Sequence, residues 1–214
     1  MNKEQIMQYY LNAKTYIEQN HPELICSIEQ DCFITQLNWQ NVTYFNGKGL
    51  THSSRTYRNI VKIRPNGDFY MTDVYVNNDS CIGLDGFQIN NSYFAGKSWN
   101  FTSEIMLGKD NNTGDVGVQV YTFKTSDVQK PIKNYFLGMG LHYKFFSYEL
   151  AVKAFPPMGR ALIVGLPLIV GSVFTFIGIG LLDEPPMGII FLFIGIVMLL
   201  WGIINLMCVM KKDE

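Results

Sequence analysis

Residues 161–182 read ALIVGLPLIVGSVFTFIGIGLL, and residues 187–210 read MGIIFLFIGIVMLLWGIINLMCVM. These two stretches decide the fold class because neither contains a charged residue. At about 1.5 Å per residue, a helix over the first stretch is about 33 Å long, and the hydrocarbon core of a bilayer is roughly 30 Å thick. The sequence therefore predicts two transmembrane helices, over 161–182 and 187–210, rather than a buried hairpin of a soluble protein.

A short linker, residues 183–186, joins the two predicted helices and reads Asp183-Glu184-Pro185-Pro186. Proline has no backbone N–H and restricts the residue before it to extended geometry, so the first helix must end there. We therefore expect a tight turn over 183–186, a transmembrane hairpin, and both chain ends on one side of the membrane.

The positive charges near the helix ends predict the orientation. Lys144, Lys153 and Arg160 precede the first helix, and Lys211 and Lys212 follow the second. The linker has no positive residue. Because cytoplasmic loops carry an excess of Lys and Arg, we expect these five residues at the cytoplasmic membrane surface and the linker outside.

Other features bear on this orientation. The sequence MNKEQIMQYYLNAK at the N-terminus lacks the apolar core of a secretory signal peptide, which agrees with a cytoplasmic domain. The Asn-x-Ser/Thr sequons argue against a cytoplasmic domain, because they would accept glycans in a lumenal domain. They begin at Asn41, Asn78, Asn90, Asn100 and Asn111. The tail, residues 211–214, contains two lysines. In a eukaryote these lysines would fit a retrieval signal of the endoplasmic reticulum, and in a bacterium they would only determine the topology.

Small residues recur along one face of each predicted transmembrane helix. Such stripes let helix backbones approach closely, which drives helix association in lipid. The members are Gly171, Thr175 and Gly178 in the first helix and Gly188, Gly195, Gly202 and Asn205 in the second. We expect them to pack within the hairpin, or against a second copy of the chain or another membrane protein, with Asn205 forming a hydrogen bond across the seam.

Residues 1–155 have the composition of a globular domain, which we expect in the cytoplasm. Up to Arg160 the chain has 15 Lys and Arg residues and 14 Asp and Glu residues. This balance argues against nucleic acid as a partner, because nucleic-acid binding depends on neutralising phosphates. Cys208 lies in the second apolar stretch, and the other three cysteines are too few for a disulfide framework. We predict that they are reduced.

The domain is predicted to begin with a helix and continue as a sheet. Over residues 3–19 apolar residues recur at three- and four-residue spacings, which indicates an amphipathic helix. Asn2 and Gln5 have the spacing of a capping box at its start. A single helix packed on a curved sheet is the expected architecture, and residues 133–148 fit either a last strand or a second helix.

Beyond Cys32 the pattern is typical of strands. Two turns, at residues 65–68 and 110–115, are rich in Asn, Gly and Asp and predict β-hairpins. The predicted strands are 33–39, 42–45, 58–64, 69–76, 103–109 and 116–124. Strands this close in sequence form an antiparallel sheet, so the predicted fold class is α+β: an N-terminal helix on an antiparallel sheet, followed by a transmembrane hairpin.

Candidate binding motifs do not meet the requirements of their chemistry. Gly96-Lys97-Ser98 resembles the end of a phosphate-binding loop, but Asn91 stands where that loop needs a glycine. Residues 110–115 resemble the start of a calcium loop, but Tyr121 stands where a bidentate Glu is required. The three histidines lie far apart and no CxxC pair exists, so we expect no metal and no cofactor.

Candidate catalytic residues are equally isolated. His52-Ser53-Ser54 would need a carboxylate and an oxyanion hole, and we expect these residues in a loop. Asp68, Asp73, Asp79 and Asp85 lie in one β region, where two of them could converge, although carboxylates at turns usually cap backbone groups. We therefore assign no catalytic residue.

The leading functional hypothesis is a non-enzymatic domain at the cytoplasmic membrane face that binds a protein partner, a lipid head group or a small ligand. Basic and aromatic residues between 124 and 160 suit a lipid surface, and a sheet edge or core explains them equally well. The alternatives are a membrane-bound enzyme acting on lipid or peptide, and an accessory subunit of a larger membrane complex.

Overall fold

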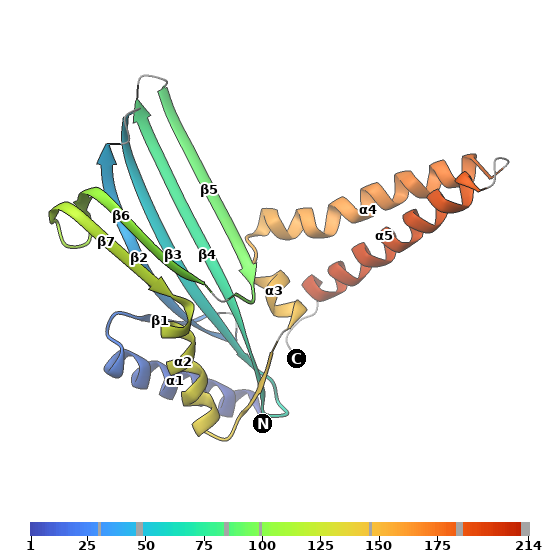
Figure 1. Cartoon of the computed structure of the whole chain (residues 1–214). Coiled ribbons are helices and arrows are strands. Elements are labelled where there is room, and N and C mark those ends of the chain that lie inside the picture. Colours follow the sequence, from blue (N-terminus) through green and yellow to red (C-terminus); the bar gives the residue numbers. More distant parts are fainter. Residues whose placement is uncertain are drawn as a thin grey trace. The chain divides into compact units, whose positions relative to one another are not determined.

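The computed structural model describes residues 1–29, 31–45, 49–83, 86–98, 100–145, 147–182 and 186–210. The chain divides into two compact units, an α+β unit (Met1–Ser147) and a helical unit (Tyr148–Glu214) (Figure 1). The elements of the first unit are α1 (Lys3–Asn20), β1 (Ile25–Glu29), β2 (Cys32–Phe45), β3 (Gly49–Ile63), β4 (Asp68–Gly83), β5 (Gly86–Gly96), β6 (Phe101–Asp110), β7 (Val116–Lys124), α2 (Thr125–Gly138) and β8 (His142–Lys144).

Helix α1 begins where the capping box predicts. Asn2 Oδ1 accepts a hydrogen bond from the Gln5 amide at 2.8 Å, and Gln5 Oε1 accepts one from the Asn2 amide at 2.9 Å. These two bonds satisfy backbone donors that the first turn leaves without helical partners. The helix ends at Asn20 and buries Tyr10, Ala13 and Ile17.

Within the described ranges the sheet has eight strands, in the order β5-β4-β3-β2-β6-β7, with β1 paired to β2 and β8 paired to β4. All pairings are antiparallel except that of β4 with β8, which is parallel. Both predicted hairpins are confirmed: β3 pairs with β4 and β6 pairs with β7. In the first turn Gly67 has φ +86°, a conformation that glycine adopts without a steric penalty.

Several strands are longer than predicted. The predicted strands 33–39 and 42–45 form one strand, β2, which has a β-bulge between Asn38 and Gln40. The expectation of a loop at His52-Ser53-Ser54 is wrong, because β3 already begins at Gly49. This part of β3 carries polar residues on both faces, so it lacks the apolar alternation that reveals a half-buried strand.

The ambiguous region 133–148 contains the end of a helix and a short strand. Helix α2 begins earlier than expected, at Thr125, and continues past Pro131 to Gly138. Val128, Ile132 and Phe136 lie one turn apart and are buried, which explains the helix. Two helices rather than one therefore pack against the sheet.

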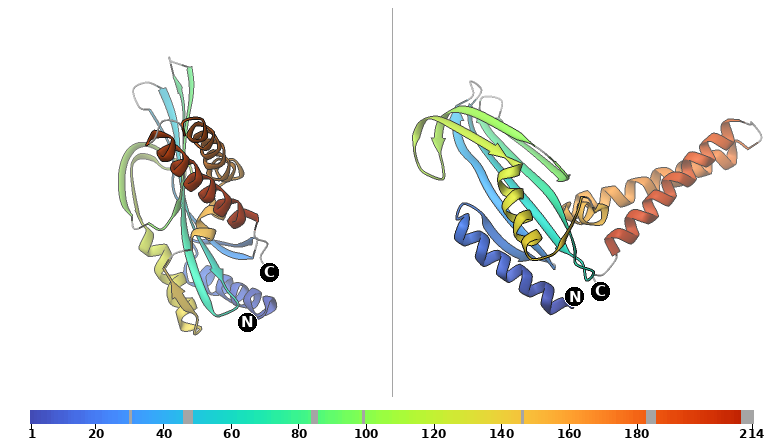
Figure 2. Two further views of the ribbon diagram at one scale, coloured as in Figure 1. Left: turned by 90° about the vertical axis from the view of Figure 1, so that its right-hand side faces the viewer. Right: turned by 60° about the horizontal axis from the view of Figure 1, so that its bottom comes forward.

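The core of the first unit lies between the sheet and the pair α1 and α2, which lie side by side (Figures 1 and 2). Phe33 of β2, Phe69 of β4 and Phe136 of α2 meet there, with ring centroids 6.0 Å and 5.5 Å from Phe136. All three side chains are fully buried. Part of the aromatic run that follows residue 124 therefore belongs to the domain core.

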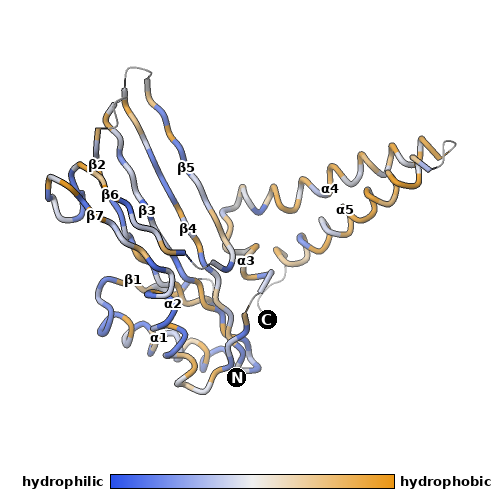
Figure 3. Tube along the Cα trace, viewed as in Figure 1, coloured by the Kyte–Doolittle hydropathy of each residue, from blue (hydrophilic) through white to orange (hydrophobic). Residues whose placement is uncertain are grey.

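The second unit consists of α3 (Tyr148–Ala154), α4 (Pro157–Gly180) and α5 (Met187–Met210). Helices α4 and α5 form a hairpin and are hydrophobic over most of their length (Figure 3). Both are long and apolar enough to cross a membrane, and only 11 % and 17 % of their most apolar windows are buried inside the protein. The α+β layout with a C-terminal pair of long apolar helices is thus confirmed.

Candidate functional site

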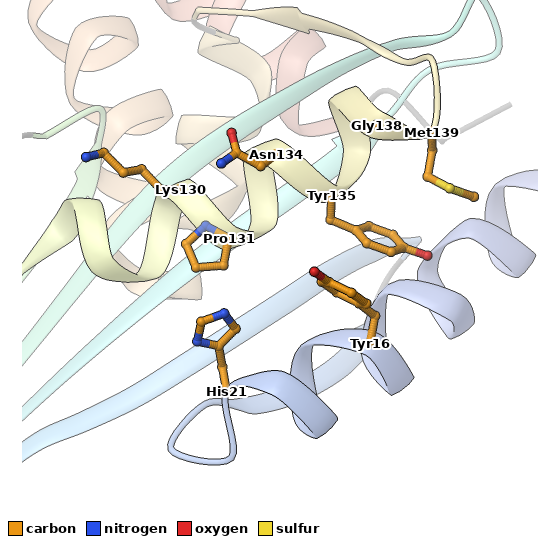
Figure 4. A pocket seen from close by; sticks show the side chains of 8 residues that line it. All are labelled: Tyr16, His21, Lys130, Pro131, Asn134, Tyr135, Gly138 and Met139. Carbon is orange, nitrogen blue, oxygen red and sulfur yellow. The ribbon is translucent and has the colours of Figure 1, made fainter.

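An open cleft with a volume of about 560 Å³ lies between α1 and α2. Tyr16 of α1 and Tyr135 of α2 stack across the gap with ring centroids 4.9 Å apart (Figure 4). Burial, and then the neighbouring hydroxyls of Tyr16 and Tyr9, raise the pKa of Tyr135, so its hydroxyl remains a hydrogen-bond donor. The two stacked rings therefore form an aromatic wall of the cleft, and each ring carries a polar hydroxyl.

Six residues line the cleft besides the stacked pair Tyr16 and Tyr135. They are His21, Lys130, Pro131, Asn134, Gly138 and Met139. His21 caps α1 by donating its amide to the Ile17 carbonyl at 2.7 Å, and its ring Nδ1 lies 3.4 Å from Glu23 Oε1. His21, Lys130 and Asn134 add polar groups to a lining that includes an aromatic stack, a composition that suits the binding of a small polar ligand or a peptide segment.

The lining residues include side chains that can exchange a proton, namely His21, Lys130, Tyr16 and Tyr135. They include no Ser, Cys, Asp or Glu that could serve as a nucleophile, among the residues that the structure describes. The sequence did not reveal this cleft, because it depends on α2, whose first half was not expected to be helical. The spacing of Val128, Ile132 and Phe136 is the sequence signal for this helix, which contains Pro131.

Asp73 of β4 is the centre of a buried polar network. Its Oδ1 accepts hydrogen bonds from Tyr57 Oη at 2.5 Å and Asn59 Nδ2 at 2.8 Å. Gln129 Nε2 of α2 lies 2.9 Å from both carboxylate oxygens, and the Ser98 amide donates to Oδ2 at 2.9 Å. Because the donors come from β3, α2 and the segment after β5, the carboxylate joins three parts of the domain.

The surroundings of this network favour a structural role. Asp73, Tyr57 and Asn59 are fully buried. Burial, and then the charge of Asp73, raise the pKa of Tyr57 well above its ordinary value, so the phenol stays protonated. In a phosphate-binding loop the Ser98 amide would point at phosphate. Here it donates a hydrogen bond to the Asp73 carboxylate.

The other predicted carboxylates do not converge. Asp79 forms a bidentate pair with Arg55, at 2.6 Å and 3.1 Å. Asp68 accepts from the Asn66 side chain at 3.0 Å and lies 3.9 Å from Lys144 Nζ. Asp85 lies outside the described residues. Each described carboxylate thus has partners of its own.

His52 and Ser53 do not form a catalytic pair. Adjacent residues of a strand point to opposite faces, and Ser53 is fully buried whereas His52 is exposed. The His52 ring Nδ1 lies 3.4 Å from Thr43 Oγ1 and from Asn111 Nδ2. Asp79 of β4, which pairs with Ser53, is a charged neighbour of both: burial opposes the shift, but hydrogen bonds from Arg55 and Ser53 and the charges of Arg55 and His52 lower the pKa of Asp79.

Hydrogen bonds hold the Asp110 turn. Asp110 accepts from the Asn112 and Thr113 amides at 2.7 Å and 3.2 Å and from Tyr121 Oη at 2.8 Å. Burial alone would raise the pKa of Asp110, but these donors hold it below its ordinary value. Within the described ranges, no group of three His, Cys, Asp or Glu residues could hold a metal ion.

The small residues of α4 and α5 face each other inside the hairpin. A Cβ atom at Gly171 would lie 2.8 Å from the Leu199 amide nitrogen, and one at Gly202 would lie 2.6 Å from Leu168 Cδ2. A Cβ atom at Gly178 would meet the Leu192 amide nitrogen.

Two further glycines and Thr175 complete the seam. A Cβ atom at Gly188 would meet the Leu181 carbonyl, and one at Gly195 would lie 2.5 Å from the Thr175 amide nitrogen. Substitution at Gly171, Gly178 or Gly195 would push the two helix backbones apart, whereas at Gly202 the nearest atoms belong to the Leu168 side chain.

Asn205 of α5 is fully buried in the same unit. Its Nδ2 donates to the Ile163 carbonyl of α4 at 3.3 Å, and its Oδ1 accepts a hydrogen bond from the Tyr148 hydroxyl of α3. These bonds satisfy a polar side chain between two apolar helices and connect α3 to both of them.

The basic residues predicted at the membrane surface lie in different elements. Lys144 ends β8, and Arg160 lies in the first turn of α4. Lys153 belongs to α3, but its side chain lies outside the described part of the chain, as do Lys211 and Lys212. In the predicted turn only Pro186 is described; its carbonyl accepts from the Ile190 amide at 3.2 Å.

Comparisons with known proteins point to no function. No protein-family model, curated protein or solved structure matches this chain.

Proposed function

We propose that this protein is a membrane-anchored binding protein, with the α4–α5 hairpin as its anchor and the α+β unit as its binding domain. The observation that carries the proposal is the exposure of α4 and α5: 11 % and 17 % of their most apolar windows are buried inside the protein. Core helices of a soluble protein bury their apolar faces, so these helices need a covering of lipid.

The orientation follows from charge. Both termini and the binding domain are cytoplasmic, because Lys144, Lys153 and Arg160 flank one helix and Lys211 and Lys212 flank the other. The cleft between α1 and α2 is the binding site in this proposal. Its stacked tyrosines and its polar donors support a partner peptide, a lipid head group or another small polar ligand.

Cysteine labelling in intact cells tests the orientation. A cysteine in place of Asn66, in the exposed β3–β4 turn, should react with an impermeant maleimide only after the cells are permeabilised. Labelling of intact cells would show that the domain lies outside. Independently, a full-length protein that stays monodisperse in buffer without detergent would contradict the anchor.

Photo-crosslinking tests the cleft. Benzoylphenylalanine in place of Tyr16 should form a discrete adduct in cells, and Gly138→Phe should abolish it by filling the cleft. Gly138 suits this purpose because a Cβ atom there has no neighbour within 4 Å, so the variant should fold. An adduct that persists in the Gly138→Phe variant would contradict binding in the cleft.

An accessory subunit of a larger membrane complex is the second candidate. The glycine stripes support hairpin formation rather than docking, since each of their glycines faces the other helix or the chain just before it. A homo-oligomer or a membrane partner would therefore have to use other faces of α4 and α5. The mass of the detergent-solubilised protein, corrected for bound detergent, distinguishes a monomer from such a complex.

A further inference from the structure

At one end of the sheet, four neighbouring strands each expose a large apolar side chain. Phe45 of β2 pairs with Leu50 of β3, Leu50 pairs with Ile82 of β4, and Ile82 pairs with Phe87 of β5. Directly paired residues point to the same side of a sheet. Their exposed fractions are 71, 56, 66 and 63 %. We call these four residues the tip row.

Strands β6 and β7 continue the same face. Thr43, which precedes Phe45 by two residues, pairs with Lys109 of β6. Side chains alternate along a strand, so every second residue of β6 before Lys109, and its partner in β7, shares the side of the tip row. The apolar residues at these positions, which we call the hairpin face, are 63–81 % exposed: Phe101, Ile105, Leu107, Val116, Val118 and Val120.

The core does not account for these exposed side chains. The inward positions of the same hairpin already pack against the sheet: Phe123 is 2 % exposed, and its ring centroid lies 5.3 Å from that of Trp39 and 5.0 Å from that of Tyr57. Contiguous apolar surface beyond a few hundred Å² marks a site of interaction with a protein or a membrane. The tip row and the hairpin face together expose ten apolar side chains, which favours such a site.

The charges on this face identify the covering. The charged residues at the outward strand positions of β2 to β7, among the described residues, are Arg58, Lys62, Lys109, Lys124 and Asp68. Asp68 begins β4, at the opposite end from the tip row, and faces Lys144. At its described strand positions the surface is thus apolar and mainly cationic, and the exposed carboxylate of Asp115 lies in the turn directly before Val116.

We propose that the tip row and the hairpin face dock on an anionic lipid surface. This inference rests on the proposed anchor, because a tether that spans the bilayer holds the domain at a high effective concentration of lipid. The cytoplasmic leaflet carries anionic lipids that attract Lys and Arg. Apolar side chains enter the interface while the lysines face the head groups.

Fluorescence of the full-length protein in lipid nanodiscs tests the docking. An environment-sensitive fluorescent amino acid in place of Leu107 should shift its emission to the blue, and lipid-borne quenchers should quench it, in nanodiscs that contain phosphatidylserine. The same residue in place of Glu4, which is exposed on α1, is the control and should remain in water. Equal quenching at Leu107 with phosphatidylcholine alone would overturn the assignment to an anionic surface.

Charge reversal tests the electrostatic part. Lys109→Glu together with Lys124→Glu should reduce quenching at Leu107 several-fold, whereas Lys3→Glu with Lys14→Glu, an equal change of net charge on α1, should not. Circular dichroism establishes that both variants are folded. Equal quenching in the two double variants would contradict the proposal.

The outcomes separate this inference from the proposed function. If the protein fails to incorporate into nanodiscs, the anchor is wrong. If it incorporates and the probe at Leu107 stays in water, the anchor stands and the docking is wrong. A blue shift without lipid quenching, together with a doubled mass, would show that a second copy covers the face and would also overturn the docking.

Discussion

Gly195 of α5 lies so close to Thr175 of α4 that a Cβ atom at Gly195 would be 2.5 Å from the Thr175 amide nitrogen. Thr175 Oγ1 and the backbone of Thr175 are both in the way, and the backbone cannot move as the end of a flexible side chain can. Thr175 also fixes its own side chain by donating to the Gly171 carbonyl at 2.8 Å. The two helices therefore meet backbone to backbone at this level.

Gly195→Leu should destabilise the hairpin by about 1–3 kcal/mol, because overpacking forces the backbones apart. Unfolding by titration with a denaturing detergent measures the loss. Gly165→Leu in α4 is the matched control, since a Cβ atom at Gly165 meets nothing within 4 Å, and it should change stability by less than about 0.5 kcal/mol. Equal effects of the two variants would show that the helices do not meet at Gly195.

The Asp73 network should contribute much of the stability of the α+β unit. Asp73→Asn puts an amide donor where Gln129 and Ser98 donate to a buried oxygen. The loss should be about 3 kcal/mol, since removing a buried charged partner leaves the other groups unsatisfied. Urea unfolding followed by tryptophan fluorescence measures it.

Asp115→Asn is the control for that measurement. Asp115 is exposed in the β6–β7 turn, so its replacement should change the unfolding free energy by less than about 0.5 kcal/mol. If Asp73→Asn behaved like Asp115→Asn, the network would be a consequence of the fold rather than a support of it.

Asp110 should make stability depend on pH. The pKa of Asp110 is lowered on folding, because the Tyr121 hydroxyl and the Asn112 and Thr113 amides together outweigh the opposing effect of burial. A carboxyl with a lowered pKa stabilises the fold fully above its unfolded pKa of about 3.9, and that stabilisation is lost as pH falls through the folded value.

Asp110→Asn should therefore be less stable than the wild type at neutral pH, and the difference should shrink as the pH falls below about 4. Unfolding of both proteins between neutral and acid pH measures it. Tyr121→Phe removes one of the donors, so it should retain part of the pH dependence. A difference that stays constant with pH would mean that the carboxylate charge is not stabilised.

Asn205 and Tyr148 should be coupled, because the Tyr148 hydroxyl donates to Asn205 Oδ1. Asn205→Ala and Tyr148→Phe should each lower stability by about 1 kcal/mol, in the range of hydrogen bonds between membrane helices. The double variant should lose less than the sum of the two single variants. Strict additivity would show that the two side chains do not interact.

Local signals in the sequence were sufficient for much of the fold. The capping box at Asn2 and Gln5 is made by residues three apart, and the turn at Gly67 needs a positive φ that glycine adopts readily. The pattern failed at His52-Ser53-Ser54 and before Pro131, where polar residues inside a strand and a proline inside a helix contradict the simple rules. Burial against other elements decided the structure there.

The sequence by itself determined the two long apolar helices, the antiparallel sheet and the lack of a recognisable catalytic motif, since these depend on composition and on spacing along the chain. Only the tertiary structure decided that Asp73 meets Gln129, that Tyr16 stacks on Tyr135 and that the tip row is exposed. These groups are brought together by strand register and by the packing of α2, and no local pattern encodes contacts between residues so far apart in the chain.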